Sequence, residues 1–195
     1  MPAARADSAL QALLAAAVER SIARLAAAGV CEEEPTVRID LTNALGPLAR
    51  ALHGTGRGAR LATLDAALCS AGREALQEQG PWLAAEAQRF EAAHPEDVLS
   101  GASGTAMAAY RAAIETELGE RFSAGLPAAL DAAEVADALA AVQAAAESLP
   151  LSREVSFDTE AAVRACWTDA FFQVLAEEEA RVRAESGEDA PRGDR

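Results

Sequence analysis

Alanine occupies 52 of the 195 positions, and this feature restricts the possible folds more than any other. Alanine has the highest helix propensity of all residues, and leucine, present 21 times, also favours helices. Aromatic residues, which favour strands, are scarce: the chain has 5 Phe, 2 Trp and 1 Tyr. We therefore predict an all-α fold, a compact bundle of six or seven helices with mixed crossing angles.

Apolar residues recur at helical spacing in seven segments, and capping residues, glycines and prolines mark most of their ends. The predicted helices span about residues 8–28, 40–53, 59–79, 81–94, 105–122, 131–148 and 158–185. We expect loops over residues 31–39 and 95–104. The prediction is one helical domain, residues 1–185, followed by a disordered acidic tail, residues 186–195.

The charge balance limits the classes of partner. Asp and Glu total 31 against 17 Arg, no Lys is present, and the formal net charge is -14. Such a chain repels a phosphate backbone, so we expect no nucleic acid partner. The missing lysines also exclude Schiff-base catalysis and P-loop phosphate binding. No segment approaches about 18 uncharged apolar residues, so we predict no membrane span.

The cysteines indicate the redox environment. Cys31, Cys69 and Cys166 are odd in number and far apart, which does not indicate a disulfide framework. We therefore expect a reducing compartment and a cytoplasmic location. Cys69 and Cys166 lie in apolar stripes, where we expect buried packing residues and not reactive thiolates.

Large aromatic side chains supply the candidate surface for a ligand or partner. This surface comprises Trp82, Phe90, Trp167, Phe171 and Phe172. Phe171 and Phe172 are adjacent and project about 100° apart on a helix. An outward Phe172 would indicate a dimer or a partner groove, whereas both rings in one wide buried face would indicate only a core.

A glycine-rich break offers a possible anion-binding loop. It comprises Gly54, Thr55, Gly56, Arg57 and Gly58, directly before a predicted helix. Backbone amides at a helix start, together with Arg57 and Arg60, are suited to a phosphate or carboxylate. The alternative is a flexible turn between two helices, because no strand precedes the loop as it does in dinucleotide sites.

The run Arg50-Ala51-Leu52-His53-Gly54-Thr55 resembles the His-x-Leu-Lys-Gly-Ser stretch of histidine phosphotransfer domains. The resemblance covers about ten residues. It implies a helical bundle that binds a receiver-like partner. Arg50 stands where that family has its phosphoacceptor histidine, so the resemblance implies a degenerate domain that carries no phosphate.

Other motifs give little support for catalysis. Glu91 and His94 have the Glu-x-x-His spacing of carboxylate-bridged metal bundles, but only one copy is present, so we predict no metal and no cofactor. Ser103 lies in a Gly-x-Ser-Gly-Thr context that misses the nucleophile-elbow pattern. The acidic run 177–179 is interpreted as a solvated helix face.

We therefore predict a non-catalytic helical interaction protein, an adaptor, regulator or assembly factor, whose partner is another protein or a second copy. One alternative is a bundle that binds a small apolar ligand near Trp82, Phe90, Trp167 and Phe171, with Arg89 or Arg164 holding an acidic head group. The phosphotransfer-like signalling domain is the other alternative. An enzyme whose catalytic residues converge from distant positions also remains open.

Overall fold

The computed structural model describes residues 3–147 and 157–187, and these residues form helices and connections without a strand. The elements are α1 (Ala3–Ala26), α2 (Val30–Glu33), the 3-10 helix η1 (Pro35–Val37), α3 (Leu41–Ala44), α4 (Pro47–Gly54), α5 (Gly58–Arg89), α6 (Pro95–Ser100), α7 (Thr105–Ala132), α8 (Val135–Glu147) and α9 (Thr159–Glu185). The prediction of an all-α fold is confirmed. Most of the predicted tail, residues 188–195, lies outside the described residues.

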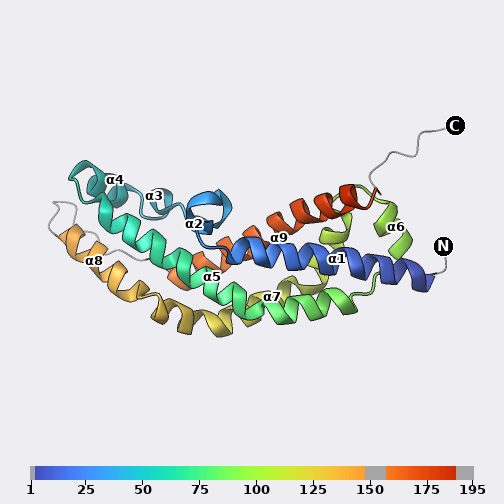
Figure 1. Ribbon diagram of the computed structural model, residues 1–195. Coiled ribbons are helices and arrows are strands. Elements are labelled where there is room, and N and C mark those ends of the chain that lie inside the picture. The colour runs from blue at the N-terminus through green and yellow to red at the C-terminus, as the bar shows by residue number, and fades with distance from the viewer. Residues whose placement is uncertain (1–2, 148–156, 188–195) are drawn as a thin grey trace.

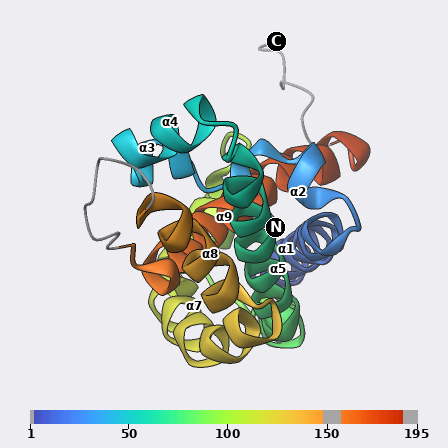
Figure 2. The same cartoon turned by 90° about the vertical axis from the view of Figure 1, so that its left-hand side faces the viewer.

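Four long helices form the body of the protein. α1 packs against α5 and α9, and α7 packs against the same two helices, so the four close a cycle around a common core. α8 extends the bundle along α5, while α6 lies against α1 and α7 (Figure 1). The start of α1, α6 and the end of α9 share one end of the bundle. Figure 2 looks along the bundle from the opposite end, which carries α4 and α8.

The described residues contain more helices than predicted because several short helices add to the count, although two long helices continue through proline. The described residues contain nine α-helices, and the predicted helices 59–79 and 81–94 are parts of the single helix α5. α7 likewise runs through Pro127. A proline removes one helical hydrogen bond and crowds the carbonyl one turn earlier. Pro81 and Pro127 are both exposed, so the helix face that loses the hydrogen bond faces the solvent, and the missing bond removes no contact from the core.

Local backbone chemistry sets the other boundaries. The predicted loops 31–39 and 95–104 contain short helical turns, namely α2, η1 and α6. The predicted helix start at Asp131 is wrong, because α7 extends to Ala132 and Glu134 adopts a φ of 55° before α8 begins. The predicted start at Asp158 is confirmed: its side chain accepts a hydrogen bond from the Ala161 amide and caps α9.

Close approach of α5 and α9 sets the centre of the core. Trp167 is fully buried, and its indole nitrogen lies where a side chain at Gly72 would stand: a Cβ there would be 2.1 Å from Nε1. This indole nitrogen has no hydrogen-bond partner among the described residues. The indole therefore packs directly on the backbone of α5, an approach that only glycine permits.

We predict that Gly72→Ala lowers the free energy of unfolding by about 1 to 3 kcal/mol, because the added methyl group overlaps the indole. The matched control is Gly119→Ala in the interior of α7, where an added Cβ meets no atom within 4 Å. That substitution should raise stability by up to about 1 kcal/mol through helix propensity. Urea unfolding measures both. Equal effects of the two substitutions would contradict the proposed packing.

The expectation that the cysteines form no disulfide is wrong. Cys31 in α2 and Cys69 in α5 are joined by a disulfide bond, with 6.0 Å between their Cα atoms. The two cysteines are 38 positions apart in the sequence, and the loop that their bond closes contains η1, α3 and α4. Cysteine number and spacing do not reveal this pair, because only the packing of α2 against α5 brings the two residues together.

Reduction of the disulfide should lower the free energy of unfolding by as much as about 4 kcal/mol, the chain-entropy value for a loop of this length. The Cys31→Ala/Cys69→Ala variant should show a comparable loss in the absence of reductant. Urea unfolding with and without reductant provides the measurement. Cys166→Ala serves as the control, since it should keep the full response to reductant, and an unchanged midpoint on reduction of the unmodified chain would refute the prediction.

Candidate functional site

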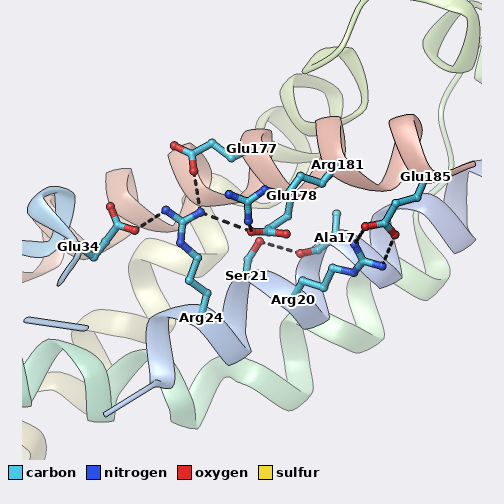
Figure 3. Close-up of polar contacts among 9 residues, drawn as sticks. All are labelled: Ala17, Arg20, Ser21, Arg24, Glu34, Glu177, Glu178, Arg181 and Glu185. Atoms are coloured by element: carbon cyan, nitrogen blue, oxygen red, sulfur yellow. Dashed lines mark hydrogen bonds and ion pairs between the residues drawn. The ribbon is translucent and has the colours of Figure 1, made fainter. Parts of the chain in front are cut away.

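A row of ionised side chains joins α1 to α9, and we call it the polar seam (Figure 3). The ionised members of the seam are Arg20, Arg24, Glu34, Glu177, Glu178, Arg181 and Glu185. The arginines of α1 point toward the glutamates of α9, and Glu34 reaches in from the turn after α2. The two helices run in opposite directions, so pairs recur along their contact.

Arg24 is the centre of the seam. Its guanidinium lies 2.6 Å from Glu177, 2.5 Å from Glu34 and 3.4 Å from Glu178. The hydrogen bond to Glu177, opposed by partial burial and reinforced by Glu34, raises the pKa of Arg24 above its ordinary value. At the other end, a hydrogen bond from Arg20 lowers the pKa of Glu185. Arg20, Arg24 and Glu185 therefore remain charged near neutral pH, and the ion pairs of the seam hold the two helices together.

A second, fully buried ion pair fixes the end of the bundle, and we call it the clamp. Glu179 and Arg183 lie one turn apart on α9, with 2.8 Å between Oε1 and Nε. Glu179 also accepts hydrogen bonds from the amides of Ala106 and Met107 at the start of α7. Arg183 donates to the carbonyls of Val98 and Leu99 in α6. The clamp thus ties α9, α6 and α7 together.

The interpretation of residues 177–179 as a solvated helix face is wrong for two of the three residues. Glu178 and Glu179 are buried, at 4% and 0% exposure. The sequence does contain a signal: Glu179 stands seven residues after Phe172 and four after Leu175, on the buried stripe of α9. An acidic residue on an apolar stripe, followed by arginine at the fourth position, indicates a buried pair.

An open groove lies beside the clamp, between the end of α5, α6 and α7, and we call it the α5–α7 groove. Its volume is about 570 Å³. Its apolar lining comes from Phe90, Ala92, Ala93, Val98, Ala109, Ala112 and Ala113, and its polar lining from Glu91, His94, Asp97 and Thr105. Much of the groove therefore exists because alanine side chains are too small to fill it.

Phe90 is held against the core at the edge of this groove. Its ring meets that of Tyr110 edge to face, with 5.7 Å between centroids. The buried Tyr110 hydroxyl donates to the Leu83 carbonyl at 2.8 Å, and burial raises its pKa above the ordinary value. Gln11 donates to the Phe90 carbonyl at 3.2 Å. These contacts give the groove a fixed aromatic wall.

The Glu-x-x-His motif falls in the groove but not on a helix. The predicted helix 81–94 is wrong at its end, because α5 stops at Arg89 and Phe90 is extended. Glu91 and His94 are both exposed lining residues of the groove. The described part of the chain holds no cluster of three or more His, Cys, Asp or Glu side chains arranged to hold a metal ion.

The predicted aromatic surface is dispersed. Trp167, Phe171 and Phe172 are fully buried, so the expectation that they line a surface is wrong. The guanidinium carbon of Arg111 lies 4.8 Å from the centroid of the Phe172 ring and covers the ring. Phe172 therefore does not have the outward orientation that would indicate a partner groove. Trp82 is half-buried beneath the guanidinium of Arg121 at 4.6 Å. Of the five predicted residues, Phe90 alone lines the groove.

The possible anion loop forms the corner between α4 and α5. The Thr55 hydroxyl donates to the Ala51 carbonyl, and Gly56 supplies a φ of 74° for the turn. Arg57 donates to the Ala145 carbonyl of α8 at 3.1 Å. Gly54 ends α4, and Gly58 starts α5. The side chains of Thr55 and Arg57 thus donate hydrogen bonds to backbone carbonyls of α4 and α8. Anion binding by this loop stays a prediction.

The remaining candidate groups have local partners. Arg89 pairs with Glu86, and Arg164 donates to the Ser123 hydroxyl at 3.0 Å. The Cys166 thiol donates to the Thr36 carbonyl, and burial raises its pKa to about 11. This thiol is protonated at neutral pH, so the expectation that it is not a reactive thiolate agrees with its surroundings.

We expect Arg183→Met to lower the free energy of unfolding by about 3 to 5 kcal/mol, because it leaves Glu179 charged and buried. Hydrogen exchange at residues 95–104 should accelerate as α6 loses its anchor. Arg20→Met is the control: it breaks a solvent-exposed pair and should change the free energy of unfolding little. A similar, small loss for both variants would argue against the clamp.

Sequence comparison places the chain in a family. Residues 1–190 match the sequence model of DUF4197, described as a protein of unknown function. No curated protein and no solved structure is significantly similar to the chain. In the part of the chain that the structure describes, no helix combines the length and hydropathy needed to cross a bilayer. Because the match spans nearly the whole sequence, the chain belongs to the DUF4197 family.

Proposed function

We propose that this protein is a non-catalytic interaction protein that binds another protein through the α5–α7 groove. The observation that carries the proposal is an open groove whose lining combines apolar residues with exposed polar side chains. Binding sites commonly pair a mainly apolar concave surface with a few placed polar groups. An open groove of this kind suits a segment of a protein better than a small molecule that needs enclosure.

The chemistry of the buried polar groups supports binding over catalysis. Glu179 and Arg183 are occupied by hydrogen bonds to backbone groups of α7 and α6. Glu178 is held by Arg24 and Arg181. These three buried side chains orient helices, and their existing hydrogen bonds and ion pairs compete with any proton transfer.

The two alternatives have weaker support. A small apolar ligand was expected near Trp82, Phe90, Trp167 and Phe171. A second, smaller cleft is lined by Ser123, Leu126, Asp158, Glu160, Ala161 and Arg164. Trp82, Trp167 and Phe171 line neither this cleft nor the α5–α7 groove. The phosphotransfer-like domain rests on the short resemblance at residues 50–55. Both stay predictions.

The cellular location also stays a prediction. The cytoplasmic expectation rested on the absence of a disulfide framework, and the bond between Cys31 and Cys69 weighs against it. Structural disulfides persist mainly in oxidising compartments. A heterologous partner is favoured over a second copy, because two chains of net charge -14 repel each other.

The test places a photo-crosslinking amino acid at Ala113, an exposed lining residue of the groove, in the full chain expressed in its native cells. We expect a discrete adduct with another protein. Ala124, exposed on α7 outside the groove lining, is the control position and should not give this adduct. Adding Ala112→Arg should abolish the adduct because the longer side chain fills the groove.

Three results would contradict the proposal. The first is the absence of an adduct at position 113 above the level at position 124. The second is an adduct that persists unchanged when Ala112→Arg fills the groove. An adduct with the mass of two chains would assign the groove to self-association and would contradict the heterologous partner.

A further inference from the structure

The small lining residues of the α5–α7 groove determine what fits into it. One side of the groove presents the ring of Phe90, and α7 presents Ala109, Ala112 and Ala113. A methyl group covers little area, so the floor stays apolar but recessed. A medium-sized apolar side chain from a partner would fill this recess and cover the half-buried Phe90 ring.

The polar lining of the groove carries one sign of charge. Glu91 and Asp97 are exposed, and the lining contains no arginine; beside them lies the exposed imidazole of His94. Within residues 3–147 and 157–187, neither carboxylate forms an ion pair. The glutamates of the polar seam differ, because each of them is paired with an arginine. The groove therefore offers two carboxylates that are electrostatically available to a partner.

The groove is also preformed. Arg183 binds the carbonyls of Val98 and Leu99, and Glu179 binds the first amides of α7, so the clamp holds both α6 and α7 beside the groove. Gly101 packs closely against Thr105, where a Cβ would lie 2.8 Å from the hydroxyl oxygen. A wall that is already ordered reduces the entropy cost of binding.

We propose that the α5–α7 groove receives a cationic amphipathic segment of a partner protein, one that inserts an apolar side chain over Phe90 and places Arg or Lys against Glu91 and Asp97. This inference rests on the proposed function and adds the chemistry of the partner. Charge complementarity selects the occupant. An acidic segment, including one from a second copy of this chain, would bring like charges together at the groove.

The test uses two synthetic peptides, one with leucines four positions apart flanked by arginines, and one in which glutamate replaces each arginine. Fluorescence anisotropy with the full, disulfide-bonded chain measures affinity, and amide NMR shifts locate the site. We expect only the cationic peptide to bind, with shifts centred on residues 90–113. Its affinity should fall as salt concentration rises, because dissolved ions screen the attraction between the arginines of the peptide and Glu91 and Asp97.

Charge-neutral variants test the role of the two carboxylates. Glu91→Gln/Asp97→Asn should weaken binding of the cationic peptide by about three- to tenfold. Glu120→Gln/Asp137→Asn changes the net charge equally at exposed positions outside the groove lining and should leave affinity within about twofold. Equal losses in the two variants would show attraction by net charge alone and would overturn the inference.

The remaining outcomes separate this inference from the proposed function. Binding of the acidic peptide with equal affinity, or peptide shifts confined to other helices, would refute the charge assignment. If position 113 still cross-links to a partner while the cationic peptide fails to bind, the cationic occupant is wrong and the proposed function stands. Failure of both the peptide and the cross-link rejects both proposals.

Discussion

The buried pair of Glu179 and Arg183 determines how one end of the bundle is arranged. Neither charge is stable in the core alone, and together they satisfy two amides of α7 and two carbonyls of α6. The connection between α5 and α7 is consequently held against α9. The α5–α7 groove depends on this arrangement, because α6 and the start of α7 contribute its lining.

The rest of the structure reflects an alanine-rich chain with few large side chains. Small residues allow helices to approach closely, as α5 and α9 do where Trp167 meets Gly72. They also supply little apolar area per residue, so other interactions must fix the helices. The polar seam joins α1 to α9, and the disulfide bond joins α2 to α5. The same smallness leaves the groove unfilled along α7.

The features predicted correctly from the sequence are those with local causes. The helix predicted over residues 158–185 agrees with α9, because Asp158 caps it and no proline interrupts it. The break predicted at Pro81 is wrong, because tolerance of an internal proline depends on which face of the helix is exposed. Burial of Phe172 was one of two alternatives, since adjacent aromatic residues do not reveal how wide the covered face is.

The candidate site was predicted only in fragments. The sequence indicated Phe90 as part of an aromatic surface, and Glu91 and His94 as a motif typical of metal sites. It did not indicate that the three residues line one groove. Composition and periodicity by themselves determined the all-α class, the absence of lysine chemistry and the acidic charge, because these follow from residue identity and local propensity. The disulfide bond, the hydrogen bonds of the clamp to α6 and α7, and the groove were decided only by tertiary packing, because each brings together residues of different helices whose proximity no local preference encodes.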